Sequence, residues 1–127
     1  LLNEKNNGEN VLKLIQNNLV LSSHDVSSGG LIVALSEMSI SSDYGVKIQK
    51  PKKLTNLFKY FFGEDQGRYI LEIDPKNLTK AQKIIDENNI YYENIGFTQK
   101  DYFEIEGELK VSIKELFKIN NEWYNKY

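Results

Sequence analysis

The chain has 127 residues, of which 40% are hydrophobic, and this is enough for one hydrophobic core. Its 16 basic and 18 acidic side chains give a formal charge of −2, and the basic residues are spread along the chain, so nucleic acid is not an expected partner. Cysteine is absent and His24 is the single histidine, which excludes disulfides, thiolate-bound zinc and a cysteine nucleophile, and we expect no metal site.

Hydropathy along the chain argues against a membrane protein. No stretch approaches the roughly 20 consecutive apolar residues of a spanning helix, and no basic-then-apolar signal region opens the chain. We therefore expect a cytoplasmic protein with no membrane partner. Because the polar run at residues 3–10 is typical of a linker, we expect residues 1–8 to be a linker or the start of a fragment, and residues 9–127 to form a single domain.

The spacing of the apolar residues predicts alternating helices and strands. In chain order, the expected elements are a helix at 9–18, a strand at 19–23, a helix at 31–40, a strand at 44–49, a helix at 54–62, a strand at 68–73, a helix at 78–89, strands at 90–97, 102–105 and 109–111, and a helix at 113–123. Residues 106–108 have the composition of a tight hairpin turn, and Ser112 with Glu115 has capping-box spacing. The fold class is α/β or α+β, with a mixed β-sheet packed against helices.

Residues 22–30 place a His-Asp pair, hydroxyl groups and two glycines between an expected strand and an expected helix. The amides and dipole of a helix N-terminus favour a phosphate or a carboxylate. The candidate cleft residues of this segment are His24, Asp25, Ser27, Gly29 and Gly30. The alternative is that Ser27 or Ser28 caps the helix while the glycines let the chain turn. Because neighbouring residues at a strand end point to opposite sides, we do not expect His24 and Asp25 alone to form a catalytic pair.

Residues 63–68 hold two carboxylates and an amide between two glycines, and the guanidinium of Arg68 follows the second glycine. Such a set can bind Mg²⁺, a ribose or a phosphate. The candidates in this segment are Glu64, Asp65, Gln66 and Arg68. The alternative is a polar turn in which Arg68 pairs with Glu64. No nucleophile elbow, P-loop or HExxH pattern is present, so we do not expect a self-contained hydrolase or kinase.

Two blocks of sequence together resemble one enzyme family. Residues 22–31 and 34–38, read as SSHDVSSGGL and ALSEM, are similar to the "HDVSDGGL…ALAEM" block of phosphoribosylformylglycinamidine synthase, the PurL family. Residues 62–69, read as FGEDQGRY, resemble the "LFGEDQGRY" block of the same family. The Ile95-Gly96 pair and the Trp123-Tyr124 ending extend the resemblance over the chain from about Gly8. Ser28 stands where the family usually has Asp, which argues against an anion, metal or proton-transfer role at that position.

The resemblance implies a PurM-like, AIR synthase-related C-terminal domain, the last of four domains of a larger enzyme. That enzyme is an ATP-dependent amidoligase of purine biosynthesis, which converts formylglycinamide ribonucleotide to formylglycinamidine ribonucleotide with ammonia from a glutaminase. The residues that hold ATP and Mg²⁺ belong mostly to the preceding domains, so we expect this domain alone to hold no cofactor and to be inactive. The implied partners are the preceding domains, the glutaminase subunit PurQ and the small subunit PurS.

The family also contains an internal duplication, and its first copy holds substrate with the counterparts of these two segments. By that analogy, His24, Asp25, Glu64 and Gln66 line a second, pseudo-symmetric cleft that contacts a nucleotide or stabilises the assembly. Two alternatives remain open. One is another synthetase of the PurM superfamily, against which residues 63–69 argue, and the other is a stand-alone module that binds a nucleotide or a protein, which a start codon close to Leu1 would support.

Overall fold

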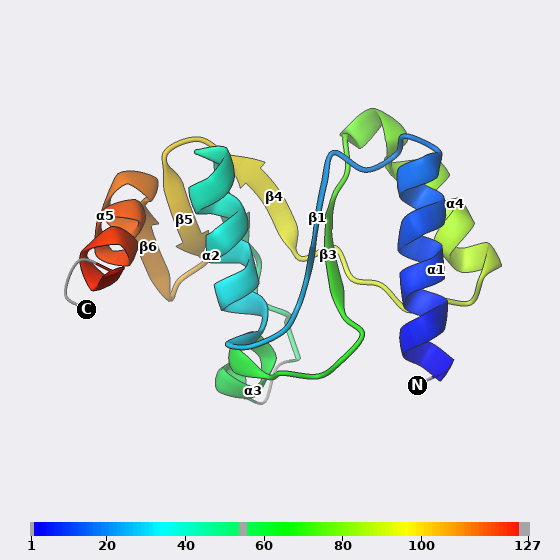
Figure 1. The fold of residues 1–127 in the computed structure, drawn as a ribbon, viewed down its shortest axis with the longest axis horizontal. Coiled ribbons are helices and arrows are strands. Elements are labelled where there is room, and N and C mark those ends of the chain that lie inside the picture. The colour runs from blue at the N-terminus through cyan, green and yellow to red at the C-terminus, as the bar shows by residue number, and fades with distance from the viewer. Residues whose placement is uncertain (1, 54–55, 125–127) are drawn as a thin grey trace. The chain divides into compact units, whose positions relative to one another are not determined.

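The computed structural model describes residues 2–53 and 56–124, which fall into two compact units (Figure 1). Unit 1 is formed by Leu1–Ala34 and Phe62–Glu93, and unit 2 by Leu35–Phe61 and Asn94–Tyr127. The elements in chain order are α1 (Leu2–Gln16), β1 (Ser22–Asp25), α2 (Gly30–Ser42), β2 (Gly45–Ile48), α3 (Leu57–Phe62), β3 (Tyr69–Glu72), α4 (Pro75–Glu87), β4 (Gly96–Gln99), β5 (Tyr102–Ile105), β6 (Leu109–Ser112) and α5 (Ile113–Tyr124). Across the described residues, no helix is long and apolar enough to cross a membrane.

Unit 1 is built on two helices and a two-stranded antiparallel sheet. Helices α1 and α4 lie side by side (Figure 1), and their buried cluster consists of Leu14, Leu19, Ala81 and Ile85. Helix α4 begins at Pro75, three residues before the start of the helix predicted at 78–89, because the Asp74 carboxylate accepts a hydrogen bond from the Lys76 N–H and Pro75 lies in the first turn. The backbone and side chain of Lys76 hold the pKa of Asp74 below its usual value, as expected for a carboxylate at a helix N-terminus.

The start of α1 corrects the expectation for residues 1–8. We predicted a linker followed by a helix from Glu9, whereas the structure is helical from Leu2. The first turns of α1 are mostly exposed and polar, so they lack the apolar spacing that marks a helix in a sequence. They are held from outside the helix, because the Asn7 side-chain amide donates a hydrogen bond to the Gly67 carbonyl at 2.9 Å.

Strand β1 is also displaced from its predicted position. We expected residues 19–23, but the strand runs from Ser22 to Asp25 and therefore includes the His-Asp pair. Leu19 instead enters the core of unit 1 directly after α1. The register of the sheet pairs His24 with Ile70 and Asp25 with Tyr69, which places the end of β1 beside the start of β3.

Unit 2 contains a four-stranded sheet in the order β4-β2-β5-β6. Strands β2 and β5 are parallel and the other two pairs are antiparallel, so the predicted mixed sheet is confirmed. One face of the sheet buries Ile48, Phe103 and Ile105. The strand expected at residues 90–97 is wrong in position, since β4 comprises Gly96–Gln99.

The hairpin and the C-terminal helix follow the sequence closely. Gly107 adopts φ 75° and the Glu108 N–H donates to the Ile105 carbonyl, which closes the predicted turn between β5 and β6. Ser112 caps α5 as predicted, because its hydroxyl accepts a hydrogen bond from the Glu115 N–H at 3.1 Å. The helix predicted at 54–62 is found as α3, and residues 54–55 lie outside the described residues.

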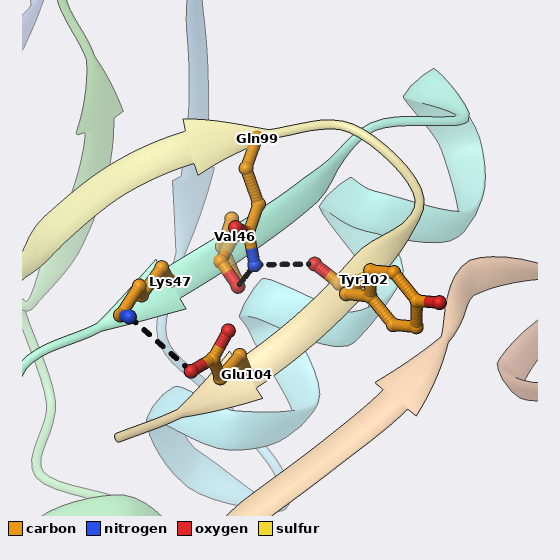
Figure 2. Close-up of polar contacts among 5 residues, drawn as sticks. All are labelled: Val46, Lys47, Gln99, Tyr102 and Glu104. Carbon is orange, nitrogen blue, oxygen red and sulfur yellow. Dashed lines mark hydrogen bonds and ion pairs between the residues drawn. The ribbon is translucent and has the colours of Figure 1, made fainter.

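A polar cluster lies on the other face of this sheet (Figure 2). The Lys47 ammonium is 3.3 Å from the Glu104 carboxylate, whose side chain is 18% exposed. The Gln99 amide donates hydrogen bonds to the carbonyls of Val46 and Tyr102. Partial burial raises the pKa of Glu104, but hydrogen bonds from Lys47 and Gln99 and the charges of Lys47 and Lys110 outweigh it and leave the pKa below its usual value.

This lowered pKa predicts an acid-sensitive sheet. Above the usual carboxyl pKa, Glu104 is ionised in the folded and unfolded chains alike, and the stabilisation from its partners is fully present. As the pH falls from about 4.5 through the folded-state pKa, the unfolded chain takes up the proton first, so the free energy of unfolding decreases. In urea unfolding at a series of pH values, Glu104→Gln should show a shallower decrease than the parent chain. The exposed turn variant Glu106→Gln is the control, and equal slopes for the Glu104→Gln variant and the parent would contradict the prediction.

Candidate functional site

Unit 1 contains a cleft of about 380 Å³ at the junction of the two sequence blocks. It forms there because β1 and β3 pair antiparallel, so the residues that follow β1 meet the residues that precede β3. The lining residues are Glu4, Asp25, Val26, Ser27, Ser28, Glu64, Gln66, Gly67, Arg68 and Tyr69. The fold thus brings together two segments that are about 40 residues apart in the sequence.

The predicted site residues divide between the wall of the cleft and its surroundings. Those that line the wall are Asp25, Ser27, Glu64, Gln66 and Arg68. Those that belong to the same two segments without lining the cleft are His24, Gly29, Gly30 and Asp65. The structure therefore brings the two predicted segments together at one cleft, whereas the sequence did not separate the residues that line the cleft from their neighbours.

Two amides of the glycine-rich turn are already hydrogen-bonded within the chain. Gly29 and Gly30 adopt φ 81° and 71°, so the glycines do turn the chain into α2, as the alternative interpretation proposed. The Gly30 N–H donates to the Ser27 carbonyl at 3.1 Å, and the Gly29 N–H donates to the Glu64 carboxylate at 2.8 Å. An amide that we expected to hold an external anion is therefore occupied by a carboxylate of the chain itself.

Arg68 does not pair with Glu64 as the alternative interpretation expected. Its guanidinium donates a hydrogen bond to the Gly63 carbonyl, and one of its nitrogens is 3.9 Å from the Asp65 carboxylate. Both partners belong to the segment that Arg68 closes. Its charge is therefore directed at its own turn, which weakens it as a ligand for a phosphate.

The His-Asp pair is in contact through the main chain. The His24 Nδ1 atom is 2.6 Å from the Asp25 carbonyl oxygen and 3.8 Å from a carboxylate oxygen of Asp25. Along β1 the two residues alternate between a half-buried and an exposed position, as expected for a strand. The Asp25 side chain is 67% exposed and lines the cleft, and its carboxylate is too far from the imidazole for a hydrogen bond.

The charges around the cleft favour ligand groups that donate hydrogen bonds. Three carboxylates line it, from Glu4, Asp25 and Glu64, and Arg68 is its single guanidinium. Carboxylates accept hydrogen bonds from hydroxyl and amino groups and repel phosphate oxygens. Within residues 2–53 and 56–124, no group of three or more His, Cys, Asp or Glu side chains is placed to hold a metal ion.

Two lining residues that the sequence analysis missed have different origins. Glu4 reaches the cleft because α1 packs on Gly67, where an added Cβ would lie 3.0 Å from the Glu4 Cα. Nothing in the polar run at residues 3–10 signals that approach. Tyr69 directly follows Arg68 and ends the second sequence block, so the block itself could have identified it.

Comparison with known proteins assigns the chain to a family. Residues 1–106 match the model of the family described as "AIR synthase related protein, C-terminal domain". The chain belongs to this family. The PurL subunit of phosphoribosylformylglycinamidine synthase from Pelagibacter ubique is 46% identical to all of it, and the subunit from Bartonella bacilliformis is 34% identical over 98% of it. The resemblance read from the two blocks is thereby confirmed, although the chain spans only 17% of the length of either relative.

Solved structures confirm the fold of this AIR synthase-related domain. Thermotoga maritima PurL complexed with FGAR matches 90% of the chain with a TM-score of 0.77 and 17% identity, and the match covers 21% of that protein. The same protein complexed with ADP matches 89% of the chain and 21% of that protein, with a TM-score of 0.76 and 15% identity. The structure of PurLQS from T. maritima contains a chain that matches 90% of this one, with a TM-score of 0.76 and 16% identity. The match covers 21% of that T. maritima chain.

Proposed function

We propose that this chain is the last domain of an ATP-dependent amidoligase that converts formylglycinamide ribonucleotide to formylglycinamidine ribonucleotide in purine biosynthesis. The similarity to PurL subunits along the whole chain is the observation that carries the proposal. The convergence of both family blocks on one cleft supports it, because the blocks are then parts of one structural feature. The domain, which includes α1 from Leu2 onward, would lie in the cytoplasm.

The cleft is the part of the domain that we propose contacts a nucleotide. Asp25, Ser27 and Gln66 line it and carry acceptors and hydroxyl groups suited to a ribose. His24, Gly29, Gly30 and Asp65 flank these residues and shape the two segments. In this arrangement the domain contributes binding and assembly, and the catalytic groups of the amidoligase lie in the rest of the enzyme.

ATP and Mg²⁺ are the cofactors that this function requires, and the residues around the cleft do not fit a triphosphate and its metal. A triphosphate needs unoccupied amide donors and cations, whereas the Gly29 amide binds Glu64 and the Arg68 guanidinium binds the Gly63 carbonyl. The carboxylates around the cleft would add repulsion. The triphosphate and its metal therefore belong to the preceding domains of the proposed enzyme.

Activity of the complete polypeptide tests the proposal directly. The reading frame that contains this chain should be expressed in full with the glutaminase and small subunits that the PurLQS structure indicates as partners. The complex should form formylglycinamidine ribonucleotide with matching release of ADP, and residues 1–127 alone should form none. Absence of product from a folded complete complex would refute the proposed function.

The cleft itself is tested by removing its acceptors. Asp25→Ala combined with Gln66→Ala in the complete protein should raise by about tenfold the ADP concentration that protects residues 22–33 from hydrogen exchange, since two hydrogen bonds to a ligand are lost. The matched control is Asp86→Ala, which removes an exposed carboxylate of α4 outside the cleft. If the double variant and the control respond to ADP alike, the cleft does not contact the nucleotide.

A further inference from the structure

Glu64 joins the two segments of the cleft through a single hydrogen bond. Its carboxylate accepts the Gly29 N–H at 2.8 Å across a separation of 35 residues. Building on the proposed function of the cleft, we infer that Glu64 is a positioning residue. It holds the glycine-rich turn in the shape that a ligand requires, and it does not itself contact the ligand.

The glycine-rich turn needs such a support. Two consecutive glycines in the left-handed region have more conformational freedom to lose than any other residue pair. The Val26 N–H donates to the Arg68 carbonyl at 2.9 Å, which fixes the beginning of the turn against the second segment. At Gly29 the Glu64 carboxylate supplies the next link between the two segments, just before α2 begins.

The backbone around Glu64 is held firmly enough for it to act as a support. The Arg68 guanidinium binds the Gly63 carbonyl on one side, and the Asn7 amide binds the Gly67 carbonyl on the other. These contacts fix both ends of the short stretch that carries Glu64. The carboxylate is thereby presented to the Gly29 amide, where a hydrogen bond to a charged acceptor is roughly twice as strong as a neutral one.

A positioning role and a direct ligand contact predict different results for a conservative variant. Gln at position 64 keeps an oxygen that can accept the Gly29 N–H, although it carries no charge. Ala removes the acceptor altogether. Direct contact with a cation through the carboxylate would instead make Gln and Ala nearly equal in their effect on the ligand. Direct contact with a ribose would weaken ADP protection in Glu64→Ala without speeding exchange of the turn in the absence of ADP.

The experiment compares Glu64→Gln and Glu64→Ala in the complete protein by hydrogen-exchange mass spectrometry, with and without ADP. Without ADP, Glu64→Ala should speed exchange in residues 26–33 by about tenfold, while Glu64→Gln should stay within about threefold of the parent. The concentration of ADP needed to protect these residues should also rise most in Glu64→Ala and least in Glu64→Gln. Glu87→Ala is the matched control, because it removes an exposed carboxylate of α4 outside the cleft and leaves the Gly29 contact in place.

Three results would overturn the inference. Glu64→Gln could weaken ADP protection as much as Glu64→Ala, Glu64→Ala could weaken it while the turn keeps its parent exchange rate, or Glu64→Ala could speed exchange without changing the response to ADP. Failure of the proposed function looks different. In that case the parent protein shows no ADP-dependent protection in residues 22–33 at all.

Discussion

Replacing Gly45 with Ala should destabilise the sheet of unit 2 by at least about 3 kcal/mol, at the upper end of the usual cost of overpacking. A Cβ built on Gly45 would lie 1.8 Å from the Tyr102 carbonyl oxygen and 2.9 Å from the Tyr102 nitrogen. These atoms belong to the backbone of the neighbouring strand β5, so they cannot rotate away as a side chain could. The strands must separate, and the free energy of unfolding measured in urea should fall accordingly.

Gly8→Ala is the matched control for this prediction. Gly8 lies inside α1, and the closest atom to an added Cβ is the Tyr69 hydroxyl oxygen at 3.3 Å. The substitution gains about 0.5–1 kcal/mol of helix propensity, offset by a small shift of a mobile side chain. We expect a change within about 1 kcal/mol of the parent. A Gly45→Ala protein as stable as the Gly8→Ala protein would contradict the close approach of β2 and β5.

Gly45 also shows where sequence reasoning reaches its limit. The alternation at residues 44–49 correctly predicted β2, because it reflects the two faces of a strand. The same pattern placed Gly45 on the more exposed face with Lys47, whereas the structure buries it against Tyr102. The missing information is the partner strand, which lies more than 50 residues away along the chain.

Errors in element position have a similar physical origin. The apolar run at 19–23 was predicted as a strand, but Leu19 completes the core between α1 and α4, and β1 starts only at Ser22. The strand expected at 90–97 is found instead at Gly96–Gln99, because these are the residues that pair with β2. By contrast, the cap at Ser112 and the hairpin turn at Gly107 were predicted correctly, since each depends on residues that are close together in sequence.

The candidate site was predictable as two segments and not as a set of contacts. Family blocks and polar composition identified residues 22–30 and 63–68, and the structure joins them in one cleft. The contact between Glu64 and Gly29 depends on the antiparallel pairing of β1 with β3, which no local pattern specifies. Glu4 enters the cleft for a related reason, since α1 approaches Gly67 only in the folded unit.

Phe103→Ala should lower the free energy of unfolding by about 3–5 kcal/mol, the usual cost of removing a buried phenyl ring. Phe103 is 1% exposed and lies in β5, which is paired on both sides by β2 and β6. Its loss leaves a cavity that the strands cannot fill, because the hydrogen bonds to both neighbours hold β5 in place. Urea unfolding followed by circular dichroism measures the change.

Phe97→Ala is the matched control, because it removes a phenyl ring that lies in the same sheet but is largely exposed. Phe97 belongs to the edge strand β4 and is 55% exposed, so its truncation removes much less apolar surface from the folded chain. We expect a loss of about 1 kcal/mol or less, because most of the ring remains in water in the folded state. If Phe97→Ala lowers the free energy of unfolding as much as Phe103→Ala does, the prediction is wrong. The Phe97 ring is then buried in solution, against a surface outside unit 2.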